Sequence, residues 1–355
     1  MSSEPARSVG AAIGDVAGRP TILHYGDVSA EYDALRTGAM MVDRSGYTIL
    51  RFEGARAAET LSGLVTSDVA ALTPGCGQIA VALTPKGKVL ADVQILSLDG
   101  ALLTLTSAPA APGWMGAIRK FVNPRFARVT DQSEQWRVLA IVGVRAARLL
   151  ATALDVDAAS LAALPRWGHR QFEASGTAGH LVRWPSLGLD GVLVLLAPAA
   201  FADTWRRVVS AGATPAGHLA WEIARIEAGT PAWGFDMDDT TIPQEVNLDD
   251  IGAISYTKGC YIGQEVVARV HFRGHVNRQL RGLLCGDDMP PPAGATLVSD
   301  GGKIVGDVRS SALSPRLGAV ALAMVRREIE PGTTLVVRWE GEESRGDVTM
   351  LPFPL

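Results

Sequence analysis

Cysteine is scarce in this chain of 355 residues, which has only Cys76, Cys260 and Cys285 and no Cys-x-x-Cys pair. Three cysteines leave one unpaired in any arrangement, which argues against a disulfide framework. Their separations also do not resemble a ferredoxin ligand run. Free thiols favour a reducing compartment, so we expect the protein to be cytoplasmic.

Several functional classes lack their sequence signals. The longest apolar run, near residues 192–202, is interrupted by Pro198 and is too short to span a bilayer, and no signal peptide is recognisable. The net charge of −4 argues against a general nucleic-acid binder. Walker A and Gly-x-Gly-x-x-Gly sequences are absent, and the acidic stretch at 236–250 fits no calcium loop. We therefore expect no membrane, no nucleic acid and no resident metal.

The chain does have enough apolar residues, 47% of the total, for two or three domains. Residues 1–20 are rich in Ala, Gly and Ser and predict a flexible N-terminal arm. Strand and helix patterns then recur without long crossovers, which predicts an α+β fold with antiparallel sheets backed by helices. One hairpin is expected from residues 78–98, around a Pro-Lys-Gly-Lys turn. Beyond residue 277, short strands and turn residues predict a small all-β module, a barrel or a sandwich.

The octet Lys258-Gly259-Cys260-Tyr261-Ile262-Gly263-Gln264-Glu265 is the most informative stretch. A helical pattern from Tyr261 to Val267 predicts that Cys260 lies at or just before a helix N-terminus. Unpaired N–H groups there, together with Lys258, would stabilise a thiolate. The residues alone leave open the alternative that Cys260 is a buried cysteine that packs as a small hydrophobe.

Downstream of the octet, Arg269, His271, Arg273 and His275 alternate with other residues as in an extended segment. Two interpretations stay open. The segment is either a solvated linker or a basic stripe that meets a polyanion or an acidic partner.

The octet resembles the signature of the YgfZ-type folate-binding proteins, which are implicated in iron–sulfur protein maturation and belong to the superfamily of the glycine-cleavage T-protein. Other segments are similar to that superfamily, and the resemblance covers nearly the whole chain after residue 20. These segments are residues 38–46, 83–92, 225–229 and 242–245.

The resemblance implies a cloverleaf of three domains around a central opening that holds reduced folate. The expected divisions are an arm at 1–20, a folate-binding region of two interwoven α+β subdomains at 21–276, and a β-barrel-like domain at 277–355. It also implies a factor that binds tetrahydrofolate, or a one-carbon-substituted reduced folate, and supports assembly or repair of iron–sulfur proteins. Iron–sulfur enzymes or their assembly machinery would then be partners, with Cys260 as the essential thiol.

The same resemblance implies the site residues. Asp92 matches the superfamily's hairpin aspartate, where a carboxylate beside N5 and N10 orients the amine and stabilises positive charge. The alternative is an ordinary strand-end aspartate bonded to backbone. The expected catalytic residues are Cys260, Lys258 and Asp92, and the expected cofactor-binding residues are Asp92, Glu227, Arg225, Tyr261 and Gln264.

Two departures from the T-protein pattern bear on function. Leu189 stands where the T-protein has its pterin-binding glutamate, and the neighbouring Asp190 should face the other side of a strand. Ala220-Trp221-Glu222 replaces Ala-Arg-Asp. Two alternative functions are a folate-dependent aminomethyltransferase that acts on a lipoyl-bound intermediate, and an inactive folate-binding or docking module.

Overall fold

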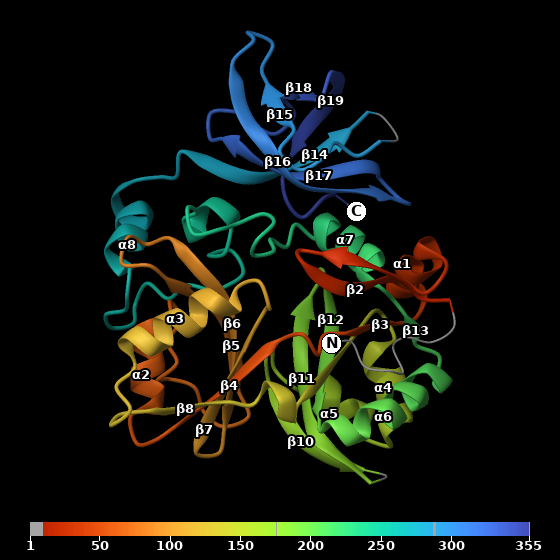
Figure 1. Ribbon diagram of the computed structural model, residues 1–355, viewed down its shortest axis with the longest axis vertical. Coiled ribbons are helices and arrows are strands. Elements are labelled where there is room, and N and C mark those ends of the chain that lie inside the picture. The colour runs from red at the N-terminus through yellow and green to blue at the C-terminus, as the bar shows by residue number, and fades with distance from the viewer. Residues whose placement is uncertain (1–9, 175, 287–288, 355) are drawn as a thin grey trace. The chain divides into compact units, whose positions relative to one another are not determined.

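The computed structural model describes residues 10–174, 176–286 and 289–354 (Figure 1). The chain forms two compact units. The first contains residues up to 82 together with 91–221, and the second contains residues 83–90 and 222–355. The tip of one hairpin, at 83–90, therefore belongs to a different unit from the rest of its strands.

A mixed six-stranded sheet forms one half of the first unit. Its neighbours are antiparallel, except that β13 runs parallel to β3. In spatial order the strands are β10 (His169–Ala174), β11 (Thr177–Ser186), β12 (Leu189–Leu196), β9 (Arg137–Val142), β3 (Met40–Asp43) and β13 (Thr214–Pro215).

Three helices lie together beside this sheet, as Figure 1 shows: α4 (Ala146–Leu154), α5 (Ala158–Ala162) and α6 (Pro198–Ser210). Every second residue of β12, namely Val192, Val194 and Leu196, packs in a core with Leu150 and Trp205 of these helices. The period of two is that of a strand with one face on a helical layer. The intervening residues of β12 therefore point to the opposite face.

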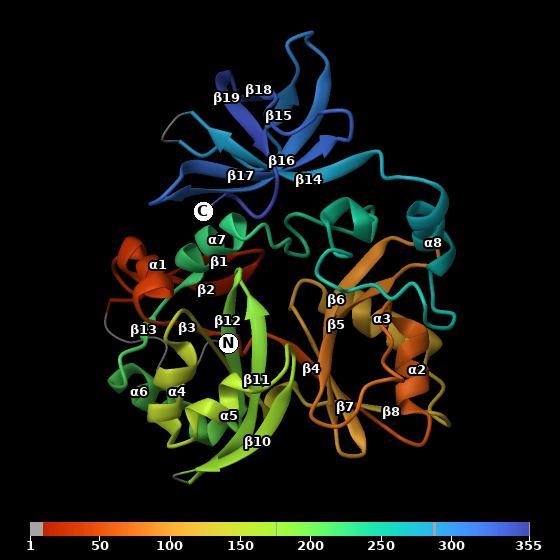
Figure 2. The same cartoon turned by 180° about the vertical axis from the view of Figure 1, so that it is seen from behind.

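The second half of the first unit is a five-stranded sheet with α2 (Ala57–Leu64) and α3 (Ala111–Phe121) beside it (Figure 2). Trp114 of α3 donates a hydrogen bond to Thr104, which places Thr104 on the helical face. In spatial order the strands are β5 (Gly77–Leu83), β6 (Val89–Leu98), β7 (Ala101–Thr106), β4 (Thr48–Glu53) and β8 (Arg128–Asp131).

The β5–β6 hairpin is present as the sequence predicts. Its turn is closed by a hydrogen bond from the Gly87 N–H to the Thr84 carbonyl, 2.9 Å long. Gly87 has a φ of +70°, a conformation that favours glycine. This turn sets the course of β6 and thus the direction in which the side chain of Asp92 points.

The helix-free faces of the two sheets approach each other. Nε2 of His169, on β10, lies 2.9 Å from the Ser97 carbonyl oxygen of β6. Arg51 of β4 is near enough to His180 of β11 to help lower its pKa. Side chains on these two faces therefore form a common interior layer of the first unit.

The N-terminal part of the described chain is a hairpin followed by a helix. Strands β1 (Ala12–Val16) and β2 (Arg19–His24) pair antiparallel and precede α1 (Val28–Thr37). The flexible arm expected at 1–20 is thus ordered as a strand from Ala12, because β2 supplies the backbone partners. Residues 1–9 of that expected arm lie outside the described residues.

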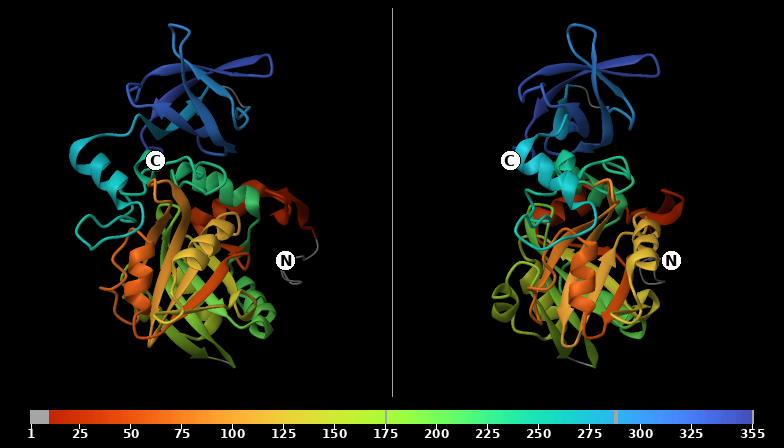
Figure 3. Two further views of the ribbon diagram at one scale, coloured as in Figure 1. Left: turned by 60° about the vertical axis from the view of Figure 1, so that its left-hand side comes forward. Right: turned by 90° about the vertical axis from the view of Figure 1, so that its left-hand side faces the viewer.

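The second unit contains α8 (Gln264–Arg273), the 3₁₀ turn η3 (Pro243–Val246) and a closed barrel (Figure 3). Leu283, Val308, Ala323 and Val337 are among the residues that fill the barrel. In spatial order its strands are β14 (Arg278–Cys285), β17 (Gly318–Arg326), β16 (Ile304–Ser314), β15 (Thr296–Val298), β18 (Thr334–Trp339) and β19 (Glu342–Thr349). The predicted α+β class with a C-terminal β-barrel is confirmed.

Two local expectations are wrong. Helix α8 begins at Gln264 rather than at Tyr261, and it continues to Arg273. Arg269, His271 and Arg273 are therefore helical rather than extended, and the alternation of basic residues was a coincidence of spacing. Among the described residues, no helix is both long and apolar enough to cross a membrane.

Candidate functional site

Asp92, on β6, is the expected site residue with the strongest chemical signal. Its Oδ1 atom is buried and has no hydrogen-bond partner among the described residues. Burying a carboxylate oxygen without a partner costs free energy, so native proteins rarely retain one without a use. The carboxyl does interact with its own backbone N–H, as in an ordinary strand aspartate, but Oδ1 is left without a partner in the described chain.

A polar chain of three residues lies next to Asp92. Nη2 of Arg44 donates to the Tyr47 hydroxyl at 3.2 Å, and Nε2 of Gln94 lies 3.4 Å from the same hydroxyl. The Oε1 atom of Gln94, like Oδ1 of Asp92, is buried and unpaired within the described part of the chain. Arg44 is close enough to Asp92 to interact with it electrostatically.

Two tryptophans extend this cluster. The rings of Trp184, on β11, and Trp221, on α7 (His218–Glu227), stack with centroids 5.6 Å apart and an interplanar angle of 4°. The guanidinium carbon of Arg44 lies 4.6 Å from the Trp221 ring centroid. Stacking on Trp221 and bonding to Tyr47 fix Arg44 in place. We call Arg44, Tyr47, Asp92, Gln94, Trp184 and Trp221 the Asp92 cluster.

Burial raises the pKa of the Asp92 carboxyl above its usual value, while its own backbone N–H and Arg44 act in the opposite direction. Raising a carboxyl pKa brings it closer to the pH at which the group can both accept and return a proton. The cluster therefore combines a carboxyl that has an unpaired oxygen with a nearby cation, Arg44, which Tyr47 and Trp221 hold in place.

Leu189 and Asp190 are adjacent residues of β12, so their side chains face opposite sides of the sheet, as the sequence predicts. Asp190 forms an ion pair with Arg183, with 2.9 Å between Nη2 and Oδ2. Asp190 alternates in phase with Val192 and Val194, so it belongs to the helix-covered face of the sheet. Asp190 thus supplies no carboxylate to the interior layer. Leu189 is on the interior side of the strand, but its side chain is apolar and cannot accept a hydrogen bond.

Cys260 is exposed, whereas Cys76 and Cys285 are half-buried. The expected helix N-terminus is not at this residue, because α8 has its N-cap at Gly263, three residues further on. The part of the expected activation that depends on helix N–H groups is therefore missing, and the contribution of Lys258 stays a prediction. The alternative of a buried, hydrophobe-like cysteine is also wrong.

The other octet residues make local contacts. Nζ of Lys258 lies 5.0 Å from the Tyr261 ring centroid. Tyr261 is buried, and burial, with a smaller contribution from Tyr256, raises the pKa of its hydroxyl to about 12. Gln264 opens α8 and donates its backbone N–H to the Tyr261 carbonyl oxygen. That these residues act on a cofactor stays a prediction.

The octet glycine Gly263 has a packing role. It has a φ of +82°, and a Cβ at this position would lie 2.5 Å from the Thr84 carbonyl oxygen. Across the same contact, a Cβ on Gly87 would lie 2.6 Å from Cβ of Val266. The start of α8 and the β5–β6 turn can approach this closely only because both positions are glycine.

Arg225 and Glu227 are held inside the second unit. Arg225 donates to Glu222, to Asp236 at 2.5 Å and to Ser310 at 3.0 Å. Burial opposes the charge on Arg225, yet Asp236 and Glu222 raise its pKa overall. Glu227 accepts a hydrogen bond from Ser314 at 2.5 Å. These contacts favour a structural role, and cofactor binding by either residue stays a prediction.

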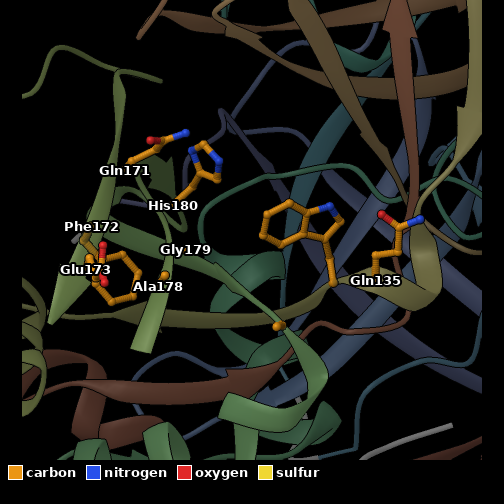
Figure 4. A pocket seen from close by; sticks show the side chains of 9 residues that line it. Gln135, Gln171, Phe172, Glu173, Ala178, Gly179 and His180 are labelled. Atoms are coloured by element: carbon orange, nitrogen blue, oxygen red, sulfur yellow. The ribbon is translucent and has the colours of Figure 1, made fainter. Parts of the chain in front are cut away.

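A surface pocket of about 490 Å³ lies elsewhere in the first unit. Figure 4 shows Gln171 and His180 beside each other and Gln135 on another side. None of the expected site residues lines this pocket. Burial, then His169 and Arg51, lower the pKa of His180 to about 4, so it is neutral at physiological pH. We place the candidate site at Asp92, because within the described part of the chain only this carboxylate has a buried, unpaired oxygen, and it lies near the fixed cation Arg44.

Sequence reasoning found Asp92 but missed the rest of the cluster. Arg44 lies within a segment recognised only for its resemblance, and Trp221 was noted only as a departure. Tyr47, Gln94 and Trp184 come from three separate strands or strand ends. No spacing along the chain brings them together, and only the layering of the two sheets does.

The fold and the cluster define a class: a two-sheet α/β body, with a buried acceptor site, joined to a C-terminal β-barrel. Residues 4–255 match the GCVT N-terminal domain, and residues 278–354 match the glycine cleavage T-protein C-terminal barrel domain. The chain therefore belongs to the glycine-cleavage T-protein family.

Its relatives are similar over nearly their full length. An aminomethyltransferase of Rubrobacter xylanophilus is 31% identical over 99% of this chain and 92% of its own length. One of Nostoc sp. is 30% identical over 93% and 89%, respectively. The fold is that of the glycine cleavage system aminomethyltransferase T from Bartonella henselae, with a TM-score of 0.87 at 24% identity, covering 99% of this chain and 96% of the other.

These relatives overturn one expectation. An iron–sulfur assembly or repair factor with Cys260 as its essential thiol is contradicted by full-length relatives that are named aminomethyltransferases. That prediction depended on the resemblance of the octet at 258–265, and close packing explains why position 263 of the octet is glycine. The broader assignment to the T-protein superfamily is confirmed.

Tetrahydrofolate, the expected cofactor, is the cofactor of this family. The residues present fit it, since the reduced pterin ring carries N–H donors and Oδ1 of Asp92 is a buried acceptor without a protein partner in the described ranges.

Proposed function

We propose that this protein is a tetrahydrofolate-dependent aminomethyltransferase of the glycine-cleavage type, with the Asp92 cluster as its site. The observation that carries the proposal is the unpaired, buried Oδ1 of Asp92 in a chain whose full-length relatives are aminomethyltransferases. The narrower YgfZ-type assignment has no support among these relatives and forms no part of the proposal.

The folate supplies the amine nitrogens that accept the one-carbon unit. The chain's own residues bind, orient and handle protons. Transfer would form a bond from the one-carbon unit to each of two folate nitrogens and would break its bonds to the lipoyl sulfur and to the amine, so that the two N–H protons end on the lipoyl thiol and on ammonia. Oδ1 of Asp92 would accept a hydrogen bond from a folate N–H and take up one of these protons. The raised pKa of the carboxyl would let it hold that proton and return it to the leaving ammonia. Arg44 keeps the ionised form available.

The test measures ammonia release from an aminomethylated lipoyl carrier protein, with and without tetrahydrofolate. Asp92→Asn keeps the shape and removes the base, so we expect release to fall about 10²- to 10⁴-fold. The control is Asp190→Asn, on the opposite sheet face and paired with the partly exposed Arg183, which should keep near-normal activity.

A stability readout separates chemistry from misfolding. Because the folded protein raises the pKa of Asp92, its charged form is disfavoured in the fold, and this group favours folding more as the pH falls. Asp92→Asn should therefore raise the unfolding free energy at neutral pH, measured in urea, and the gain should shrink as the pH falls. Folate-dependent release that survives Asp92→Asn would overturn the proposed role. Folate binding without any release by the wild type would instead indicate a binding module.

A further inference from the structure

Strand β6 presents a second unpaired acceptor next to the first. Gln94 lies two residues beyond Asp92, so both side chains leave the same face of the strand, with Cα atoms about 6.5 Å apart. Gln94 pairs with Leu105, while the adjacent Thr104 contacts α3. Asp92 and Gln94 therefore face the interior layer between the two sheets.

The burial of Gln94 has a cost that folding alone does not explain. Only 7% of the residue is exposed, yet its Oε1 finds no partner among the described residues. An unpaired buried carbonyl costs folding free energy, and an apolar side chain of similar volume would avoid that cost. Its neighbours Val93, Ile95 and Leu96 show that β6 accepts apolar residues.

The amide is also held in one orientation. Its Nε2 lies 3.4 Å from the Tyr47 hydroxyl, which accepts a hydrogen bond from Arg44. Arg44 in turn stacks on Trp221. With the nitrogen end engaged, the oxygen is the free end of the amide. This is a preorganised acceptor rather than a mobile side chain.

We propose that Oε1 of Gln94 acts with Asp92 to accept hydrogen bonds from the pterin ring of reduced folate, and that Gln94 sets the affinity for that ring. The inference rests on the proposed function. A reduced pterin carries several N–H donors along its edges, which suits two acceptors on one strand face. The p-aminobenzoylglutamate tail ends in carboxylates, which two acceptors would repel. Leu189 provides no acceptor, so β6 supplies the polar contacts.

The experiment is calorimetric titration with three probes: tetrahydrofolate, tetrahydropterin for the ring, and p-aminobenzoylglutamate for the tail. Gln94→Leu should weaken binding of tetrahydrofolate and tetrahydropterin about 10- to 100-fold, the equivalent of one lost buried hydrogen bond. Binding of the tail should not change. Gln94→Glu keeps an acceptor and should bind tetrahydropterin more tightly than Gln94→Leu does.

Ile95→Val is the matched control, because Ile95 is buried on the same strand and faces the opposite side. It should leave all three affinities unchanged. If Gln94→Leu does not fold, Gln94→Met tests the same loss with a more adaptable side chain.

The outcomes distinguish the two proposals. A wild-type protein that binds no tetrahydrofolate would overturn the proposed function. A wild type that binds it, beside a Gln94→Leu protein that binds tetrahydropterin equally well, would overturn only the role of Gln94. A loss of equal size on the tail probe would overturn the assignment to the pterin ring.

Discussion

The octet at 258–265 and the interior face of β6 differ in what makes each of them distinctive. The octet stands out in the sequence, yet its cysteine is exposed and its glycine serves close packing. On β6, Asp92 is marked in the sequence only by its resemblance to the superfamily's hairpin aspartate and Gln94 is not marked at all, yet each has a buried oxygen without a partner in the described chain.

The difference shows that a rare motif and a chemical site need not coincide. Backbone geometry can by itself restrict which residues a sequence motif contains. Gly263 is an example, because it has a positive φ and an added Cβ would lie 2.5 Å from the Thr84 carbonyl oxygen. Unpaired buried polar atoms are a different signal, because the fold tolerates their cost only where something else offsets it. The two regions can therefore be separated by mutation.

The largest effect should come from the octet glycine. Gly263→Ala forces a side chain into the left-handed region and against the Thr84 carbonyl, so we expect a loss of about 3–5 kcal/mol in unfolding free energy, measured in urea. Gly259→Ala is the matched control inside the same octet, since no atom lies within 4 Å of its added Cβ. It should change stability by less than about 0.5 kcal/mol. Equal effects of the two substitutions would remove the packing explanation.

How much the sequence could predict depends on the range of the interactions. The β5–β6 hairpin and the β-rich C-terminal part follow from local alternation and turn residues, and both are present. The start of α8 was placed three residues early, because the left-handed Gly263 interrupts an otherwise helical pattern. Strand β1 was missed, because its small residues gain a partner only once β2 folds against them.

The candidate site was predictable only in part. Asp92 was found because it matches the hairpin aspartate of the superfamily that the sequence resembles. Gln94 was not, because an isolated glutamine in an apolar strand carries no local signal. Trp184 and Trp221 are 37 positions apart in the chain and meet only as a stacked pair in the fold. Contacts of this range come from the packing of strands and helices against one another, which the sequence pattern does not specify.

A second prediction concerns two buried histidines, His169 and His180, and the pH dependence of stability. Nδ1 of His169 and of His180 are also buried and unpaired within the described ranges. The folded protein lowers the pKa of His180 to about 4 through burial, then His169 and Arg51. An unfolded chain takes up this proton near pH 6.5, so the stability due to this group is complete above that pH and is lost as the pH falls towards 4.

The expected loss from His180 is roughly 3 kcal/mol between pH 6.5 and pH 4, from about 2.5 pKa units at 1.36 kcal/mol each. Urea titrations across this range should show that His180→Phe removes this part of the pH dependence. His275→Gln, at an exposed position, should not change it. An unchanged slope in His180→Phe would mean that the two histidines are not held neutral by the fold.

The smallest effect should come from the residue that the sequence singled out most. Cys260 is exposed, and the N-cap of α8 lies beyond it. Cys260→Ala removes no buried surface, so it should alter unfolding free energy by less than about 0.5 kcal/mol. Tetrahydrofolate affinity and ammonia release should also stay within about twofold of wild type, because the proposed chemistry belongs to Asp92. Calorimetry and the ammonia assay, run beside Asp92→Asn, make the comparison direct. A Cys260→Ala protein that binds folate normally but no longer releases ammonia would return the thiol to the reaction and show that the octet, not only β6, carries chemistry.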